Sequence, residues 1–384
     1  MALDRDVCYS AVLARDSRFD GTFFTAVKTT KIYCRPICPA RTPHARNCDF
    51  FASAASAQTA GYRPCLRCRP ELSPTVAAWR GTENTVSRAL ALIAQGALDD
   101  DHTVDQLAER LGMGERQLRR LFSEHLGASP MAVAQTRRVL FAKQLLHDST
   151  LSIAQVALAS GYGSVRRFNE AFRNGCGKSP TELRRINGQC PKKSTDSNTA
   201  TRLKLSYRGA YDWRAAVTEL LRLNPSATAA GLQYRQTFVH HGAPAELLLS
   251  ERPGYLELLL KTESVASLHK LVACVREALD LDADLPKIHG QLSMDSLLAR
   301  RVKTHPGLRI VSAIRCSDSD TQPNHCASEA LAKGSLTDAF DSTNQELQRL
   351  TKLSAQALEA RAEQWRPWRA YAAQLLRHKQ AICE

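Results

Sequence analysis

Apolar residues recur at helical spacing through residues 85–190, and short glycine-containing turns interrupt the pattern. The stretch "TVDQLAERLGMGERQLRRLFSEHLGASP" predicts a helix, a turn at Gly112–Gly114 and a second helix. "SPMAVAQTRRVLFAKQLLHDS" predicts one longer helix, and "LSIAQVALASGYGSVRRFNEAFRNGCGKSP" repeats the first pattern with its turn at Gly161–Gly163. We therefore predict an all-α domain of two helix-turn-helix units joined by a connecting helix.

The first 80 residues have a different pattern. "VCYSAVLARD" predicts a short helix, and the β-branched and aromatic residues of "TFFTAVKTTKIYC" predict a strand or hairpin. "ASAASAQTAGY" predicts a helix that ends at Gly61. A small mixed domain is expected here.

After the helical region, "CPKKSTDSNTA" is polar without an apolar period and predicts a linker. Strands are then predicted from "LKLSYRGAYDW" and "GYLELLLK", and helices from "WRAAVTELLRL" and "SVASLHKLVACVREALD". Residues 316–345 are polar, and the stretch 311–345 is the least certain part of any fold. "SAQALEARAEQWRPWRAYAAQLLRHKQ" predicts a closing helical run. The predicted fold is multidomain α+β, with domains at 1–80, 85–190 and 201–384 and a linker at 191–200.

Among the features of the composition, only the net charge indicates a class of partner. The 384 residues are 43% hydrophobic, which is enough for packed cores, and no run reaches the roughly 18 apolar residues of a membrane span. The formal charge is +14, and residues 1–190 hold 26 Lys and Arg against 17 Asp and Glu. This excess favours a polyanion partner for the N-terminal half. The N-terminus "MALDRDVCYS" has no export signal, so we expect a cytoplasmic, nucleoid-associated bacterial protein without a membrane partner.

Four of the twelve cysteines form two close pairs, Cys34 with Cys38 and Cys65 with Cys68. Two such pairs separated by tens of residues are typical of a four-thiolate zinc site, because each short spacing lets two sulfurs reach one ion. From the spacing alone, a purely structural zinc knuckle is the favoured form of such a site. A pair of disulfides fits less well in a long chain without an export signal.

The sequence around these pairs also resembles a known family. "FDGTFFTAVKTTKIYCRPICPAR" and "GYRPCLRCRPE" are similar to the N-terminal domain of the Ada methylation-response regulators, over nearly all of residues 4–74. The resemblance implies that the four cysteines bind one Zn²⁺ and that Cys34 accepts a methyl group from a methylated DNA phosphate. It also places Arg35, Arg41 and Arg67 where DNA phosphate approaches.

The implied chemistry agrees with the properties of thiols. The thiolate is the nucleophile, zinc keeps it deprotonated, and the thioether product makes the protein a single-turnover methyltransferase. Zinc with four thiolates carries two net negative charges, and methylation of one sulfur removes one of them. At about 8 Å from a DNA phosphate, one charge is worth roughly 0.5–2 kcal/mol. Loss of this repulsion is our hypothesis for how methylation raises DNA affinity.

The helix-turn-helix region resembles the DNA-binding domain of the AraC transcription-factor family over residues 88–186. The resemblance places the starts of the two recognition helices near Gly114 and Ser164. Arg and Gln side chains suit base edges in the major groove, whereas others in the set would only contact phosphate. The alternative is a solvated helix face. The exposed candidates are Glu115, Arg116, Gln117, Arg119, Arg120, Ser164, Arg166, Arg167 and Asn169, and the expected core residues are Leu118, Leu121, Phe122, Phe168 and Phe172.

The C-terminal region resembles AlkA-type alkyl-base DNA glycosylases in "YRGAYDWRAAVTELL", "THPGLRIVSA" and "ALEARAEQWRPWRAYAAQLL". The middle of that family's helical core is missing, and the family's Asp-x-Phe-x-x-x-Asp motif reads "DAFDSTN" here. Asn344 therefore stands at the catalytic position, after Asp338 and Phe340, and Asp341 is out of register. A neutral amide cannot supply the required negative charge, so we predict a degenerate remnant that either packs as an accessory domain or folds poorly.

Other candidate groups receive an ordinary structural interpretation. No Pro-Cys-His-Arg motif of the alkylguanine-repair domain occurs, and His102, His305 and His325 stand alone. Our first hypothesis is a DNA alkylation sensor that binds double-stranded DNA and, with RNA polymerase, activates alkylation-repair genes. The alternatives are a regulator fused to a working 3-methyladenine glycosylase, and a transcription factor whose zinc is only structural.

Overall fold

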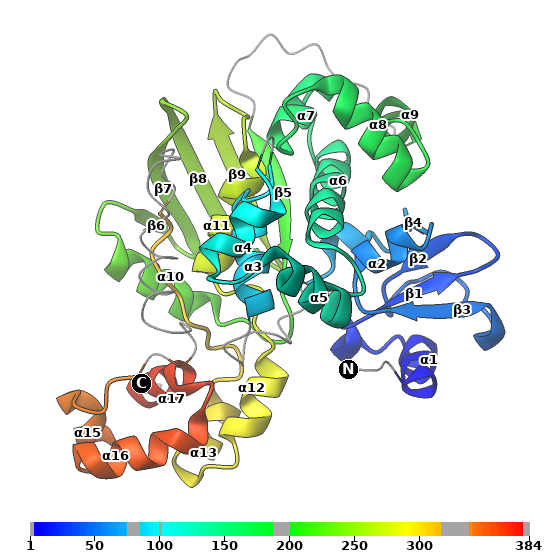
Figure 1. Ribbon diagram of the computed structural model, residues 1–384. Coiled ribbons are helices and arrows are strands. Elements are labelled where there is room, and N and C mark those ends of the chain that lie inside the picture. Colours follow the sequence, from blue (N-terminus) through cyan, green and yellow to red (C-terminus); the bar gives the residue numbers. More distant parts are fainter. Residues whose placement is uncertain are drawn as a thin grey trace.

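The computed structural model describes residues 4–74, 85–99, 102–186, 200–315, 338 and 340–378. It confirms the predicted class: a small mixed domain, an all-α helix-turn-helix domain and a C-terminal α+β region (Figure 1). Nearly all of the predicted linker 191–200 and most of the stretch 316–345 lie outside the described residues. Among the described helices, none is both long and apolar enough to cross a membrane.

The N-terminal domain has a four-stranded sheet ordered β3-β1-β2-β4. Its elements are α1 (Arg5–Ala14), β1 (Phe24–Val27), β2 (Ile32–Cys34), β3 (Cys48–Phe51), α2 (Ala54–Thr59) and β4 (Arg63–Pro64). Strands β1 and β2 form the predicted hairpin. A capping box of Ser53 and Ser56 begins α2, and Gly61, with a positive φ of 83°, follows its end as predicted.

The helix-turn-helix domain consists of α3 (Thr85–Ala94), α4 (Val104–Arg110), α5 (Glu115–Leu126), α6 (Pro130–Asp148), α7 (Ile153–Ala159), α8 (Val165–Cys176) and α9 (Pro180–Ile186). The recognition helices α5 and α8 begin where predicted, after the N-caps Gly114 and Ser164. Capping boxes at Thr103 and Ser152 begin the first helix of each unit. Of the expected core residues, Leu121 is half-buried and the others are fully buried: Leu118, Phe122, Phe168 and Phe172.

The α+β domain is built on an antiparallel sheet ordered β5-β9-β8-β7-β6. Its elements are β5 (Thr201–Ser206), α10 (Trp213–Leu223), β6 (Thr228–Ala230), β7 (Gln233–His240), β8 (Ala243–Arg252), β9 (Tyr255–Thr262) and α11 (Leu268–Ala278). The strand predicted over 203–213 ends at Ser206, because Gly209 turns with φ 72° and Asp212 then caps α10. Alternate leucines of β5 and β9 face the core.

Five further helices follow among the described residues: α12 (Leu285–Leu292), α13 (Ser296–Thr304), α15 (Gln345–Thr351), α16 (Ala355–Ala362) and α17 (Arg369–Arg377). They enclose their own hydrophobic cluster, which buries Trp365 and Trp368. The described part of this region is therefore packed, as in the accessory-domain alternative. The predicted closing helical run is interrupted between α16 and α17, where Pro367 lacks a backbone N–H and follows a 3₁₀ turn at Glu363–Trp365.

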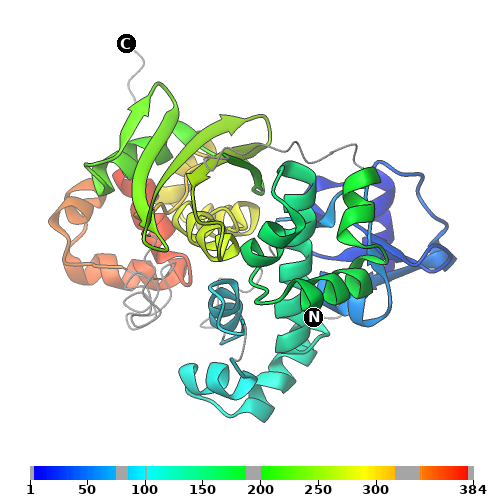
Figure 2. The ribbon, with the colours of Figure 1, turned by 90° about the horizontal axis from the view of Figure 1, so that it is seen from above.

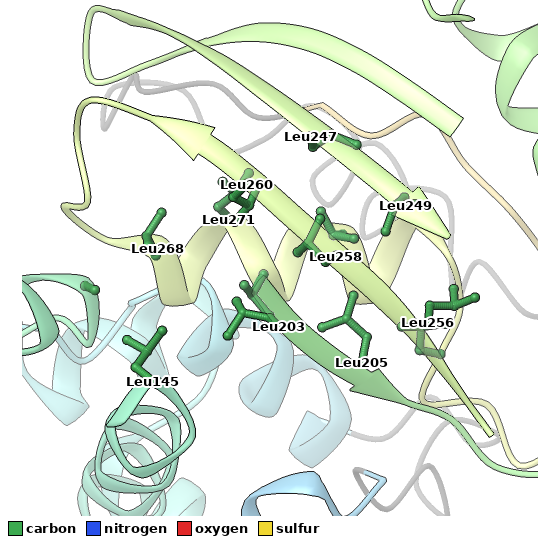
Figure 3. Packing of buried hydrophobic residues seen from close by; sticks show 14 of the residues in the cluster. Leu145, Leu203, Leu205, Leu247, Leu249, Leu256, Leu258, Leu260, Leu268 and Leu271 are labelled. Carbon is green, nitrogen blue, oxygen red and sulfur yellow. The ribbon is translucent and has the colours of Figure 1, made fainter. Parts of the chain in front are cut away.

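The helix-turn-helix domain lies between the other two domains (Figures 1 and 2). Helix α6 packs against α2 on one side and against β5 on the other. One hydrophobic cluster runs from α6, α7 and α8 into the sheet and α11, and it includes Leu145, Leu203 and Leu268 (Figure 3). The second helix-turn-helix unit and the α+β domain therefore share a core.

Candidate metal centre and DNA interface

The sheet of the N-terminal domain brings the two cysteine pairs together. Strands β2 and β4 are parallel neighbours, with Tyr33 opposite Pro64 in the register. Cys34 ends β2 and Cys65 follows β4, so both emerge at the same edge of the sheet. The backbone N–H of Cys65 donates to the Tyr33 carbonyl oxygen at 3.0 Å, and a turn from Arg35 to Cys38 places the remaining member of the first pair.

The four sulfur atoms fit a single tetrahedral metal ion. The Sγ atoms of Cys34, Cys38, Cys65 and Cys68 all lie within 4.8 Å of one another. Four sulfurs at about 2.3 Å from one Zn²⁺ would be about 3.8 Å apart, so only small adjustments are required. Cys65 and Cys68 are buried, whereas Cys34 and Cys38 are half-buried. This donor set is that of a four-thiolate zinc site, and its accessible side is the first pair.

Backbone N–H groups donate to two of the four sulfurs, both in the second pair. The Arg35 N–H donates to Cys68 Sγ and the Arg67 N–H to Cys65 Sγ, each at 3.4 Å. Among the described residues, no backbone N–H donates to Cys34 Sγ. Because such bonds disperse the negative charge of a thiolate, the charge on Cys65 and Cys68 is reduced relative to that on Cys34.

The three arginines expected near DNA phosphate differ in their surroundings. Arg35 is held inside the domain, since its Nε donates to Asp20 Oδ1 at 2.9 Å and its Nη1 to the Cys68 carbonyl oxygen at 3.2 Å. Arg41 and Arg67 are exposed. Arg35 thus orients the second cysteine loop, and a role for Arg35, Arg41 and Arg67 at phosphate stays a prediction.

The recognition helices expose most of the side chains predicted to face DNA. On α5 the exposed residues are Arg116, Gln117, Arg119 and Arg120, and on α8 they are Arg166 and Arg167, while Ser164 and Asn169 are half-buried. Arg119 pairs with Glu115 one turn earlier, with 2.7 Å between Nε and Oε1. These positions suit both a DNA interface and a solvated face, so the assignment of individual contacts stays a prediction.

An ion-pair network that the sequence analysis missed joins the metal loop to α6. Lys143 of α6 is fully buried, and its Nζ pairs with Glu71 and donates to the Cys65 carbonyl oxygen at 3.3 Å. Arg69 contacts both Glu71, at 2.9 Å, and Asp148, through two bonds of 3.0 and 3.1 Å. The loop that carries Cys65 and Cys68 is therefore fixed to the connecting helix of the DNA-binding domain.

The charges in this network are stabilised by one another. Burial raises the pKa of Glu71, but Lys143 and Arg69 lower it by more, so the carboxyl pKa lies below its usual range. Burial, together with the charges of Arg69 and Lys143, lowers the pKa of neighbouring His147 to about 4. Near neutral pH the network therefore holds the charged Glu71 carboxylate beside an uncharged His147.

One signal for this network was present in the sequence. Residues 139, 142 and 146 of α6 are apolar and buried, and Lys143 lies on the same helical face. A lysine within an apolar stripe needs a buried partner. The partner, Glu71, lies 72 residues away in sequence, which the helical pattern alone could not reveal.

The residues at the predicted glycosylase position have structural roles. The Asn344 side chain caps α15 by accepting from the Leu347 N–H at 3.2 Å. Asp338 pairs with Arg366 and Arg369. Asp341 is exposed and accepts a hydrogen bond from the Thr343 N–H at 2.9 Å.

The remaining candidates are also structural. Cys8, Cys48 and Cys176 are buried, and burial raises the pKa of Cys176 to about 12. His102 contacts the Asp99 carbonyl oxygen at 2.9 Å, and the His305 ring lies against that of His378. His325 lies outside the described residues, as do Cys190, Cys316, Cys326 and Cys383.

Three segments of the chain match family models. Residues 7–71 match the metal binding domain of Ada, residues 107–186 match a helix-turn-helix domain, and residues 202–315 match the AlkA N-terminal domain. The matched segments follow the three domains of the structure in order.

Several known proteins are similar to parts of the chain. A Mycobacterium tuberculosis protein named "Probable bifunctional transcriptional activator/DNA repair enzyme AlkA" is 37% identical over 314 residues, which cover 80% of this chain and 62% of that protein. The Escherichia coli "Bifunctional transcriptional activator/DNA repair enzyme Ada" is 38% identical over 173 residues, covering 44% of this chain and 47% of that protein. The chain therefore spans less than two thirds of the length of these relatives.

Solved structures match the N-terminal part. The DNA methyl phosphotriester repair domain of E. coli Ada is 48% identical, with 18% of this chain and 76% of that chain covered and a TM-score of 0.17. The crystal structure of the methylated N-ADA/DNA complex is 33% identical, with 35% of this chain and 98% of that chain covered and a TM-score of 0.18.

Proposed function

We propose that this chain, which joins an Ada metal binding domain, a helix-turn-helix domain and an AlkA N-terminal domain, is a sensor of DNA alkylation that regulates transcription. The observation that carries the proposal is the four-thiol centre at the edge of the N-terminal sheet, with its accessible sulfurs on Cys34 and Cys38. This centre is fixed directly to the helix that connects two DNA-binding units.

Cys34, Cys38, Cys65 and Cys68 would hold one Zn²⁺, whose chemical contribution is to keep the sulfurs as thiolates at neutral pH. Cys34 Sγ attacks the methyl carbon of a DNA methyl phosphotriester. A sulfur–carbon bond forms as the carbon–oxygen bond breaks, and the electron pair of that bond stays on the phosphate oxygen. The products are a thioether on Cys34 and an ordinary phosphodiester anion.

Two features of the site support Cys34 as the acceptor. It is half-buried, whereas Cys65 and Cys68 are buried, so a substrate reaches its sulfur more easily. Cys38 is also half-buried, so access favours the first pair over the second. Cys34 Sγ receives no hydrogen bond from a described backbone N–H, whereas the sulfurs of Cys65 and Cys68 each receive one.

Methylation would also change how strongly the protein binds DNA. Removing one negative charge from the centre weakens its repulsion of the phosphate backbone, by roughly 0.5–2 kcal/mol at about 8 Å. Exposed arginines on α5 and α8 supply the attraction that then dominates. Activation of repair genes further implies that the bound protein contacts RNA polymerase.

We also propose that the C-terminal region has lost glycosylase activity. The neutral Asn344 serves as a helix cap, and Asp338 is neutralised by two arginines. Neither side chain lines the pocket at the meeting point of the domains or the pocket beside Arg138 and Tyr162. Release of free 3-methyladenine in catalytic amounts from methylated DNA would favour the bifunctional alternative instead.

The decisive experiment is peptide mapping by mass spectrometry after incubation with DNA that carries methyl phosphotriesters. We expect one added methyl group on the peptide that contains Cys34, and none on the peptide that contains Cys65 and Cys68. Unmethylated DNA is the control for adventitious alkylation. Absence of modification would leave only the structural-zinc interpretation.

A further inference from the structure

A pocket of about 250 Å³ lies where the three domains meet. The N-terminal domain contributes Phe24, α6 contributes Arg137 and Phe141, and α11 contributes Val272 and Arg276. The metal centre and the exposed faces of the recognition helices do not line this pocket. It is therefore distinct from the metal centre and from the predicted DNA-facing surface, although Glu71 of the ion-pair network also lines it.

Most charged groups around the pocket already have partners. Asp99 accepts from His269 at 2.8 Å, and Arg138 lies 3.8 Å from the same carboxylate. Arg276 donates to the Ser206 carbonyl oxygen at 3.1 Å and pairs with Asp282. These groups balance one another and leave little demand for a ligand.

Arg137 is different. Among the described residues, no acceptor receives a hydrogen bond from its guanidinium, and no carboxylate pairs with it. Its side chain is half-buried and lines the pocket. Burial lowers the pKa of Arg137, with Asp282 opposing this effect and Arg276 adding to it. A guanidinium in such a place is most stable when an anion accepts its hydrogen bonds.

The rest of the lining is mainly apolar, and its apolar side chains come from all three domains. They include Phe24, Leu90, Ile93, Phe141 and Val272. The pocket volume is slightly smaller than about 300 Å³, the lower end of the range for ligand-binding pockets. The lining thus offers a small apolar surface and, in Arg137, a guanidinium without a partner among the described residues.

We infer that this pocket binds a small organic carboxylate, with the carboxylate on Arg137 and an aromatic or aliphatic body against Phe24, Phe141 and Val272. The guanidinium fork suits a carboxylate through two parallel hydrogen bonds. Because the lining belongs to three domains, the ligand stabilises this arrangement of the domains relative to one in which they separate. The pocket is therefore an effector site, independent of methyl transfer.

Thermal unfolding and isothermal titration calorimetry of the full chain test this inference with benzoate and hexanoate as probes. Benzamide is the neutral match for benzoate, and acetate at equal concentration controls for salt and for a carboxylate without an apolar body. We expect at least one of the two probes to raise Tm progressively with concentration and to give saturable heats. Benzamide and acetate should do neither.

Arg137→Met should abolish the shift without lowering Tm in the absence of probe, since no described partner is lost. Arg214→Met, on the exposed face of α10, is the matched control and should keep the shift. Equal effects of benzamide and benzoate, or an unchanged shift in Arg137→Met, overturn the inference. The inference is also overturned if neither benzoate nor hexanoate changes the Tm of the unmodified chain. This last test does not require any variant to fold.

Discussion

The buried pair between Lys143 and Glu71 makes a strong prediction about how the metal centre is supported. Replacing Lys143 with Met keeps the length of the side chain but removes its charge. Glu71, with 1% of its side chain exposed, would then keep only Arg69, which Asp148 shares. Breaking a buried pair by removing one partner costs about 3–5 kcal/mol, and the remaining arginine favours the lower end.

The variant also removes the hydrogen bond to the Cys65 carbonyl oxygen, so we expect the metal loop to open together with the domain contact. Denaturant unfolding can be monitored by the release of zinc to a chromophoric chelator. This measurement reports both on the opening of the metal loop and on the loss of the domain contact. Lys143→Met should release zinc at lower denaturant than the unmodified chain. Lys303→Met, which changes an exposed lysine on α13, should leave the midpoint unchanged.

A double variant separates pairing from packing. Adding Glu71→Gln to Lys143→Met removes the stranded carboxylate, so part of the lost stability should return, with a coupling of about 1–3 kcal/mol. If the two changes were simply additive, or if Lys143→Met unfolded like the unmodified chain, the network would not support the metal loop.

Three further predictions concern other parts of the molecule. Gly307→Ala should cost about 1–3 kcal/mol in thermal unfolding, because a Cβ there would meet backbone atoms at 2.5 and 2.7 Å, whereas Gly290→Ala, with open space around it, should be neutral or slightly stabilising. His147 has a pKa of about 4 when folded and 6.5 when unfolded, so its contribution to stability is present above pH 6.5 and is lost as pH falls towards 4. His147→Gln should flatten the dependence of the unfolding midpoint on pH in that range, and an unchanged slope would refute the assignment. DNA binding by Arg166→Ala can be measured in a fluorescence-anisotropy titration. If Arg166 contacts a base, binding should weaken by about 1–3 kcal/mol, and if it contacts a phosphate, the slope of log affinity against log salt concentration should fall by about 1. The control Arg214→Ala should show neither change.

Local features of this chain could be read from its sequence because each depends on neighbouring residues. Helices α5 and α8 begin directly after Gly114 and Ser164, where the sequence predicted their starts. The spacing of Cys34 with Cys38 and of Cys65 with Cys68 correctly predicted one cluster. These signals are short-range patterns of spacing and capping.

Contacts between domains could not be predicted in the same way. No shared periodicity links Lys143 with Glu71 in the sequence. Likewise, the sequence does not indicate that Arg35 pairs with Asp20. The end of β5 at Ser206 depended on a turn that the apolar pattern does not distinguish from a continuing strand. Such features depend on tertiary packing, which overrides local propensity.

The core shared by the second helix-turn-helix unit and the α+β domain has a consequence for how this architecture can change. Leu145 of α6 packs in the same cluster as Leu203 of β5 and Leu268 of α11 (Figure 3). Deleting the α+β domain would expose that leucine surface on the DNA-binding domain and leave it prone to aggregation. Selection on DNA binding alone would therefore retain the α+β domain, whether or not it ever acts on a base.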